Sequence, residues 1–176
     1  ILITGGNQGS HLLNLAVEGC LDKLTKRAFI IHQCGQSKFQ DFERLKEKMS
    51  DRYQVREWID DMATVLKKVD LVICRAGINT LMELAYLNKP ALVIPLPNLY
   101  QDEQNKNAKY FAKLGLVRVL PESKLSSESL LKNIAEMLKN LNSLKMRAKG
   151  ARKVVIADAA QRLALETVLL YEISRI

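Results

Sequence analysis

Short apolar runs rich in β-branched residues alternate with stretches of helical periodicity, and this alternation constrains the fold more than any other feature of the sequence. We predict strands at residues 1–4, 28–32, 54–57, 70–74, 91–95 and 116–120. Between them we predict helices at residues 10–24, 38–49, 62–68, 80–87 and 103–114. Three of the strand runs are apolar on both faces, as in a parallel sheet covered by helices on both sides. The alternation therefore favours a doubly wound parallel sheet with right-handed crossovers.

The alternation stops after residue 120, where two further helices are expected. The first covers residues 126–140, and the hydroxyls of its opening Ser-Ser-Glu-Ser segment can cap it. The second covers residues 158–176, with Asp158 as its candidate N-cap, and Gly115 has the position of a C-cap after helix 103–114. We interpret residues 1–176 as one α/β, Rossmann-like three-layer domain with a parallel sheet of about six strands. Because the chain begins without Met, inside an apolar run, we expect it to be part of a longer protein.

The composition argues against several classes of function. The net charge of +8 suits an anionic partner such as a nucleotide or an anionic membrane surface, although a solvated basic surface explains it equally well. Aromatic residues do not interleave with the basic ones, so we expect no nucleic acid as a partner. The cysteines form no Cys-x-x-Cys pair and neither histidine has neighbours at ligand spacing, which predicts no disulfide framework, no metal site and a reducing cytoplasm. No apolar run is long enough for a transmembrane helix.

Two loops after predicted strands have residues suited to a phosphate. The glycine-rich segment 5–10 follows the first strand, and its glycines allow close backbone approach to an anion at the next helix N-terminus. It is neither a Gly-x-Gly-x-x-Gly fingerprint nor a P-loop, and a tight turn explains it equally well. After the fourth strand, Gly77 turns the chain and Thr80 is followed by Glu83. This pair is either a capping box or a diphosphate and ribose site in which the carboxylate accepts both ribose hydroxyls.

Two further loops are rich in polar side chains. After the third strand, Asp60 or Asp61 can cap the next helix, while Trp58 either flanks a flat base or packs against the core. After the fifth strand, two prolines end the strand and a polar cluster follows. Asp102 as a helix cap explains one member of this cluster. It leaves unexplained three side chains that suit sugar hydroxyls, namely Glu103, Gln104 and Asn107.

Six short motifs occur in one order along nearly the whole chain, and together they resemble the C-terminal domain of the MurG family. They are Gly5-Gly6-x-Gln8-Gly9, His32-Gln33-x-Gly35, Ile59-Asp60-Asp61-Met62, Cys74-Arg75-x-Gly77-x-x-Thr80-x-x-Glu83, Lys89-Pro90-Ala91 and Asp102-x-Gln104-x-x-Asn107-Ala108. Members of this family are UDP-N-acetylglucosamine:undecaprenyl-diphospho-muramoylpentapeptide N-acetylglucosaminyltransferases of peptidoglycan synthesis. The resemblance implies a GT-B enzyme, in which two Rossmann-like domains flank the active site. This chain would be the C-terminal, donor-binding half, and the N-terminal acceptor domain would lie outside it.

The resemblance also implies roles for individual residues. The Ile59 backbone would pair with the uracil edge, Asn7 would lie near the diphosphate, and Glu83 would bind the ribose hydroxyls. The implied donor-binding residues are Asn7, Gln8, Ile59, Met62, Ile78, Asn79, Thr80, Leu81, Met82, Glu83, Glu103, Gln104 and Asn107. Three positions depart from the family pattern: Asn7 and Ala76 replace a usual Ser, and Glu103 replaces Gln or His.

The implied reaction is an inverting displacement without a metal or other cofactor. An acceptor hydroxyl of the lipid-linked muramoyl-pentapeptide would attack the anomeric carbon of UDP-N-acetylglucosamine, and UDP would leave. Helix N-termini near Ser10 and Thr80 could stabilise the developing diphosphate charge, and the general base would belong to the other domain. The resemblance and the positive charge together predict a cytoplasmic enzyme at the inner face of the bacterial inner membrane.

Other interpretations stay open. One is another GT-B enzyme that uses UDP-N-acetylglucosamine, either an epimerase or the small catalytic subunit that makes N-glycan precursors. The latter usually has His-Ala-Gly where this chain has Arg75-Ala76-Gly77. A second is a non-catalytic nucleotide-binding module. Selective binding of UDP and UDP-N-acetylglucosamine over adenine nucleotides would distinguish the enzymes from this module.

Overall fold

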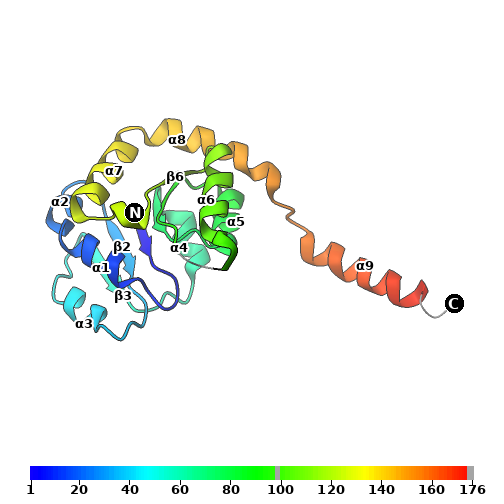
Figure 1. Cartoon of the computed structure of the whole chain (residues 1–176), viewed down its shortest axis with the longest axis horizontal. Helices are drawn as coiled ribbons and strands as arrows, with labels where there is room; N and C mark the ends of the chain where they lie inside the picture. The colour runs from blue at the N-terminus through cyan, green and yellow to red at the C-terminus, as the bar shows by residue number, and fades with distance from the viewer. Residues whose placement is uncertain (98–99, 174–176) are drawn as a thin grey trace.

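The protein folds around one parallel β-sheet in a computed structural model that describes residues 1–97 and 100–173 (Figure 1). The strands of the described part are β1 (Leu2–Thr4), β2 (Ile30–Gln33), β3 (Tyr53–Arg56), β4 (Val72–Cys74), β5 (Ala91–Val93) and β6 (Val117–Val119). They form a six-stranded sheet in the order β3-β2-β1-β4-β5-β6, and every neighbouring pair is parallel. The expected doubly wound sheet is confirmed, with each predicted strand present within about two residues of its expected bounds.

Alternate residues of the central strands enter opposite cores, which makes the domain three-layered. Ile3 and Ile73 pack with helices α1 (His11–Glu18), α2 (Leu21–Thr25), α3 (Asp41–Lys46) and α7 (Ser127–Lys139). Their neighbours Leu2 and Val72 face α4 (Met62–Lys68), α5 (Ile78–Leu87), α6 (Glu103–Lys113) and α8 (Leu141–Ala148). Because side chains alternate along a strand, a strand that is apolar at consecutive positions must be covered on both faces, as predicted.

The predicted helix at residues 10–24 is wrong as a single element, because the structure has α1 and α2 with a break between them. The break occurs at Gly19, the C-cap of α1. A Cβ added to Gly19 would overlap the Ser127 side chain at the start of α7. Helix α7 therefore packs closely on α1 at this position. The predicted helix at 38–49 is also shorter in the structure, as α3.

Several predicted caps are confirmed. Ser126 accepts from the backbone N–H of Ser129, whose hydroxyl accepts in return from Ser126 N–H, so both residues form a capping box at α7. Asp61 accepts from Thr64 N–H at 2.9 Å and caps α4. Hydrogen bonds from the Thr64 side chain and backbone lower the pKa of the Asp61 carboxyl. Gly115 follows α6 with φ +79°, as a left-handed C-cap requires.

Two candidate caps have other roles in the structure. Helix α5 begins at Ile78 with Gly77 as its N-cap, so Thr80 lies inside the first turn and the Thr80–Glu83 capping box does not form. Asp102 has the N-cap position of α6, but φ is +56° there and no side-chain cap is made. Its carboxylate instead accepts from Asn105 Nδ2 at 2.6 Å. Thr80 and Glu83 are therefore not explained by capping.

After α8 the chain passes through η3 (Lys149–Val154) into α9 (Ala159–Ile173), which projects away from the rest of the domain (Figure 1). Its last predicted residues, 174–176, lie outside the described part. Asp158 pairs with Arg162 at 2.9 Å, and the Asp158 carbonyl accepts from Arg162 N–H, so the helix begins where it was predicted. Its apolar side chains are exposed to solvent. Among the described residues, none of the helices combines the length and the apolar character that crossing a membrane requires.

Candidate functional site

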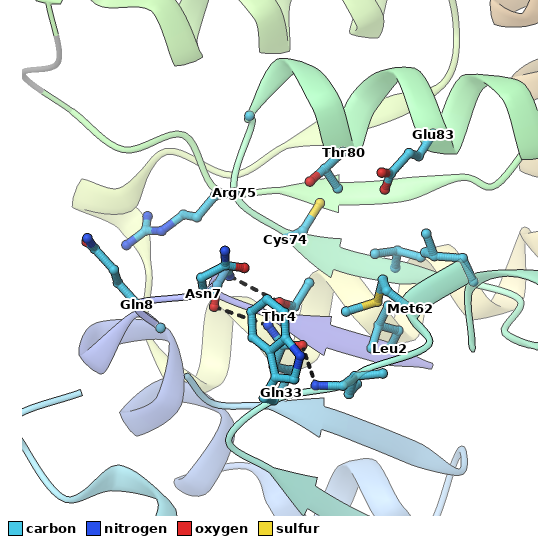
Figure 2. A pocket seen from close by; sticks show the side chains of 18 of the residues that line it. Leu2, Thr4, Asn7, Gln8, Gln33, Met62, Cys74, Arg75, Thr80 and Glu83 are labelled. Carbon is cyan, nitrogen blue, oxygen red and sulfur yellow. Dashed lines mark hydrogen bonds between the residues drawn. The ribbon is translucent and has the colours of Figure 1, made fainter. Parts of the chain in front are cut away.

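A cavity of about 650 Å³ opens at the carboxyl ends of β1 and β4 (Figure 2). The chain winds from β1 toward β2 and from β4 toward β5, so this is the point where the direction of the sheet reverses. Open α/β sheets bind ligands at this place because two strand-to-helix loops diverge there. The lining residues are Leu2, Thr4, Gly5, Gly6, Asn7, Gln8, Gly9, Gln33, Trp58, Ile59, Asp60, Met62, Leu66, Val72, Cys74, Arg75, Gly77, Thr80, Glu83, Leu96 and Gln104.

The first wall is the glycine-rich loop between β1 and α1. Gly9 has φ +73° and packs backbone to backbone against residues 34 and 35. A Cβ on Gly9 would overlap the Cys34 carbonyl oxygen, and one on Gly35 would overlap the Gly9 backbone. Gly6 has φ +84° and faces open space. These glycines pin the loop to the end of β2 and leave the exposed side chains of Asn7 and Gln8 at the cavity edge.

The opposite wall is the N-terminus of α5. The first N–H groups of a helix have no partner within it, and those of α5 belong to Ile78, Asn79 and Thr80. The N-cap is Gly77, which has no side chain to cap them. At α1, by contrast, Ser10 Oγ accepts from Leu13 N–H at 3.4 Å. The α5 N-terminus therefore presents free donors and partial positive charge beside the cavity, which is a favourable arrangement for an anion.

Thr80 and Glu83 point from α5 toward the same cavity (Figure 2). Their spacing of three residues places both side chains on one face of the helix. Glu83 is exposed and makes no hydrogen bond or ion pair with the described residues, so both carboxylate oxygens are available to a ligand. A carboxylate one turn beyond a free helix N-terminus can accept from a vicinal diol attached to a bound phosphate.

A buried glutamine joins the two ends of the cavity. Gln33 is 2% exposed, donates from Nε2 to Gly6 O at 3.3 Å, and accepts at Oε1 from Ile59 N–H at 3.1 Å. The Ile59 N–H is thus already used, and its carbonyl accepts no hydrogen bond from the described residues. Trp58 lies beside it and is 47% exposed, so it forms a rim of the cavity and is not a core residue. Met62 completes this apolar end.

Of the three predicted sugar-binding residues of α6, only Gln104 lines the cavity. Gln104 Oε1 accepts from Ala76 N–H at 3.2 Å and from Leu96 N–H at 2.9 Å, which leaves its Nε2 donors for the cavity. Asn107 donates to Ala76 O at 3.2 Å and does not line the cavity. Both amides therefore hold the β4–α5 turn. Glu103 is exposed and lies outside the cavity lining.

Arg75 is the cation nearest to the cavity and ties several loops together. Among the lining residues described, it is the sole Lys or Arg. Its Nη2 donates to Ser10 Oγ at 2.6 Å and lies 2.5 Å from Glu122 Oε2, while Nη1 donates to Ile94 O at 3.2 Å. Both members of the ion pair are largely buried, with side chains 13% and 14% exposed. The loops after β1, β4, β5 and β6 are thus linked through one guanidinium.

The structure brings seven of the thirteen predicted donor-binding residues to the cavity lining: Asn7, Gln8, Ile59, Met62, Thr80, Glu83 and Gln104. Ile78 and Asn79 are exposed at the start of α5, where their N–H groups and not their side chains are the useful donors. Leu81 is fully buried in the core and its N–H bonds to Gly77 O, while Met82 packs on the same core. The cavity lining therefore does not include the side chains of Leu81, Met82, Glu103 and Asn107.

Sequence reasoning did not single out Gln33 and Arg75 as site residues. Each stands inside a motif already noted, His32-Gln33-x-Gly35 or Cys74-Arg75-x-Gly77, at the end of a strand. A polar residue that directly follows a buried apolar strand was the available signal, because strand ends meet at one edge of a parallel sheet.

The thiols near the site are unsuited to act as nucleophiles. All three cysteines are free and buried. Burial raises the pKa of the Cys74 thiol to about 12, so it stays protonated. Among the described residues, no group of three or more His, Cys, Asp or Glu side chains could hold a metal ion.

The chain is similar to known proteins over nearly its whole length. The family described as Glycosyltransferase family 28 C-terminal domain matches residues 1–163. A UDP-N-acetylglucosamine--N-acetylmuramyl-(pentapeptide) pyrophosphoryl-undecaprenol N-acetylglucosamine transferase from Trichlorobacter lovleyi is 34% identical over 165 residues, which cover 92% of this chain and 43% of the relative. The crystal structure of Acinetobacter baumannii MurG superposes with a TM-score of 0.79 at 33% identity, over 92% of this chain and 47% of that one.

A more distant structure shares the fold alone. The calicheamicin glycosyltransferase CalG4 superposes with a TM-score of 0.71 at 16% identity, over 97% of this chain and 42% of that one. The chain thus spans less than half the length of these three relatives. The α/β, Rossmann-like fold class is confirmed, and its structural neighbours are GT-B glycosyltransferases. With nearly its whole length matched, the chain belongs to the glycosyltransferase family 28 C-terminal domain family.

Proposed function

We propose that residues 1–176 are the donor-binding half of an N-acetylglucosaminyltransferase that uses UDP-N-acetylglucosamine. The observation that carries this proposal is the uncapped α5 N-terminus at the switch point of the sheet, with Glu83 on the same wall. The free donors at Ile78, Asn79 and Thr80 suit a diphosphate. Asn7 and Gln8 approach it from the opposite loop. Similarity to N-acetylglucosamine transferases over nearly the whole chain supports the same assignment.

The ribose, the uracil and the sugar of the donor can then be assigned to the parts of the cavity around the diphosphate. Both carboxylate oxygens of Glu83 accept from the ribose hydroxyls. The uracil lies at the apolar end, where the Ile59 carbonyl can accept its N3–H and Trp58 and Met62 flank its ring. The Gln104 Nε2 group is free to donate to the sugar.

The reaction that follows is an inverting displacement at the anomeric carbon. A hydroxyl of a lipid-linked muramoyl-pentapeptide acceptor attacks, the bond to the UDP oxygen breaks, and the proton passes to a base outside this chain. The contribution of this chain is to orient the donor and to stabilise the charge that develops on UDP. The α5 N-terminus supplies that stabilisation through its N–H donors.

We also propose that the basic surface holds the full-length protein at an anionic, cytoplasmic membrane face, where a lipid-linked acceptor resides. The net charge of +8 supports this placement. The test is cosedimentation at low salt with vesicles that contain or lack an anionic lipid. Equal binding to both kinds of vesicle contradicts the membrane proposal and leaves the donor site unaffected.

The donor site is tested by calorimetric titration of this chain with UDP, UDP-N-acetylglucosamine, UDP-glucose and ADP. We expect uridine-selective binding that Glu83→Ala weakens about tenfold or more, since a charged hydrogen-bonding partner contributes about 1.5–3 kcal/mol. The matched control is Glu166→Ala, which removes another exposed carboxylate, on α9. It should leave the affinity unchanged.

The titration also separates the proposal from its alternatives. Equal affinity for UDP and ADP in the folded chain would favour a nucleotide-binding module without uridine selectivity. Uridine selectivity without transfer to the muramoyl acceptor by the full-length protein would favour an epimerase or an N-glycan-precursor transferase.

A further inference from the structure

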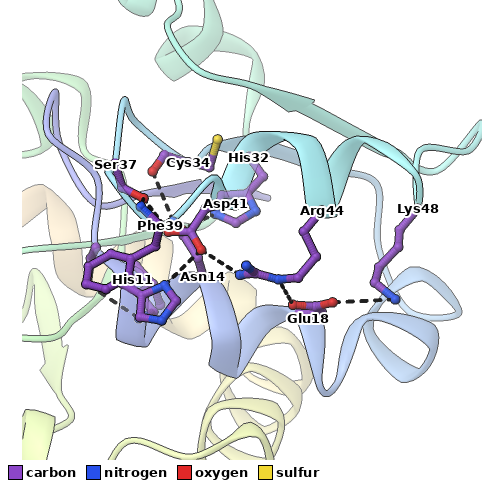
Figure 3. Close-up of polar contacts among 12 residues, drawn as sticks. His11, Asn14, Glu18, His32, Cys34, Ser37, Phe39, Asp41, Arg44 and Lys48 are labelled. Carbon is purple, nitrogen blue, oxygen red and sulfur yellow. Dashed lines mark hydrogen bonds and ion pairs between the residues drawn. The ribbon is translucent and has the colours of Figure 1, made fainter.

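A buried polar network joins α1, the end of β2 and α3 behind the glycine-rich loop (Figure 3). It lies on the α1 side of the sheet, opposite the face covered by α5. Its centre is Asn14 of α1, which is fully buried. Asn14 Nδ2 donates to Cys34 O at 3.0 Å and to Asp41 Oδ2 at 2.8 Å. Asn14 Oδ1 lies 3.1 Å from His32 Nε2, and His32 Nδ1 lies 2.9 Å from the Tyr53 hydroxyl.

The contacts of Asn14 determine where each proton must be. Both hydrogens of its amide nitrogen are used, by Cys34 O and Asp41 Oδ2. Its oxygen Oδ1 can only accept, so His32 must carry its proton on Nε2. His32 Nδ1 then accepts from the Tyr53 hydroxyl. Burial lowers the pKa of His32 to about 3, which keeps the ring neutral and consistent with this tautomer. Each polar group of the chain from Tyr53 to Asn14 therefore has a defined partner.

Asp41 anchors the network at its other end. Besides Asn14, it accepts from Ser37 Oγ at 2.8 Å and from Arg44 Nη2 at 2.5 Å, and His11 Nδ1 lies 2.8 Å away. Burial raises the pKa of the Asp41 carboxyl, but these hydrogen bonds outweigh it and the pKa is lowered overall. The carboxylate is thus fixed by several elements and gives Asn14 one well-defined orientation.

The network reaches the cavity through the end of β2. Asn14 holds the carbonyl of Cys34, and it is against this carbonyl that Gly9 packs without room for a Cβ. The preceding residue, Gln33, bonds to Gly6 O and to Ile59 N–H. A change at Asn14 therefore displaces the surface on which the glycine-rich loop rests.

We propose that Asn14 is a positioning residue for the donor site, which sets the place of the loop 5–10 by holding the Cys34 carbonyl against Gly9. The proposal rests on the proposed function, because it assigns the loop to the donor diphosphate. Asn14 itself does not line the cavity. If Asn14 had a structural role alone, its substitution would lower stability without changing the conformation of loop 5–10 or the affinity for UDP.

Tyr53→Phe is the matched control for Asn14. It removes a buried hydrogen bond from the same network but at the end far from Gly9. His32 can still donate from Nε2 to Asn14, so the contact between Asn14 and Cys34 is preserved. The two test variants are the isosteric Asn14→Asp and the smaller, neutral Asn14→Ser. The neutral variant excludes an effect of added negative charge on phosphate binding.

The experiment combines nuclear magnetic resonance of the ¹⁵N-labelled free chain with calorimetric titration by UDP, below the unfolding temperature of each variant. We expect both Asn14 variants to shift the amide resonances of Gly6 and Gly9. They should also weaken UDP binding about tenfold, the effect of losing one hydrogen bond to a charged group when a pre-organised loop is displaced. Tyr53→Phe should leave the Gly6 and Gly9 resonances unchanged and the UDP affinity within about twofold of wild type, because it keeps the contact between Asn14 and Cys34 and so leaves the binding groups in place. This should hold even where Tyr53→Phe lowers stability.

Two outcomes would overturn the proposal. The first is an Asn14 variant that folds and keeps wild-type glycine resonances and affinity, and the second is an equal loss of affinity in Tyr53→Phe. Failure of the wild-type chain to bind UDP would count against the proposed function instead. In that case the Gly6 and Gly9 resonances of the free variants decide the positioning role, since unshifted resonances contradict it.

Discussion

Gly9→Ala should damage the glycine-rich loop much more than Gly6→Ala, although both glycines have positive φ. An alanine in the left-handed region costs about 1–2 kcal/mol at either position. At Gly6 the new methyl group meets open space. At Gly9 it would lie well under 3.0 Å from the Cys34 carbonyl oxygen and 3.1 Å from Gly35 Cα. Contacts of a Cβ atom shorter than 3.0 Å are essentially never seen in proteins.

The loop or the end of β2 must therefore move to admit the Gly9 methyl group. Overpacking of this kind costs about 1–3 kcal/mol beyond the backbone strain. We expect the free energy of unfolding to fall by about 2–5 kcal/mol in Gly9→Ala and by about 1–2 kcal/mol in Gly6→Ala. Gly77→Ala is a further control, because Gly77 has φ −67° and open space around it. It meets no steric overlap, and because alanine is a poorer N-cap than glycine it should lower the free energy of unfolding by about 1 kcal/mol or less.

Urea unfolding followed by circular dichroism measures all three variants, with equal slopes of free energy against urea required for the comparison. UDP titration of the folded variants should show a larger loss of affinity for Gly9→Ala than for Gly6→Ala. Equal stabilities of Gly9→Ala and Gly6→Ala would refute the reasoning, because they would mean that the loop does not rest on the Cys34 carbonyl.

Burial lowers the pKa of His32 to about 3, so below pH 6.5 the unfolded chain binds a proton that the folded chain does not. The contribution of His32 to the free energy of unfolding, measured by urea titration, should therefore fall by about 2 kcal/mol from pH 8 to pH 5. His32→Gln should lose this pH dependence, and a variant with the pH dependence of the wild type would contradict the reasoning. Arg75→Met leaves the buried Glu122 carboxylate unpaired and should lower the free energy of unfolding by about 3 kcal/mol. Adding Glu122→Gln should recover part of this loss. A double variant no more stable than Arg75→Met would refute the pairing. Ser126→Ala removes half of a capping box and should lower the free energy of unfolding by about 1 kcal/mol; no change in urea unfolding would show that the box contributes little.

The strands and most helices could be predicted from the sequence because their signals are local. Consecutive apolar residues such as Leu71 to Cys74 require burial on both faces, and this single fact implies a sheet between two helical layers. The caps at Ser126 and Gly115 were equally predictable, since each depends on neighbouring residues alone. Helix 10–24 was predicted too long because the break at Gly19 was not predicted; in the structure Gly19 ends α1 and lies against Ser127 of α7.

The sequence by itself determined which residue types follow each strand, and so it determined the edge of the sheet where a site must lie. It left undecided whether Thr80 and Glu83 cap a helix or face a ligand, because both roles use the same residues at the same spacing. The tertiary structure decided this by starting α5 at Ile78, which leaves the helix N-terminus open and directs both side chains to the cavity. It also decided the contacts of Gln33, Arg75 and Asn14 with distant loops. Those contacts depend on how strands far apart in the chain are placed side by side, and local periodicity does not encode that placement.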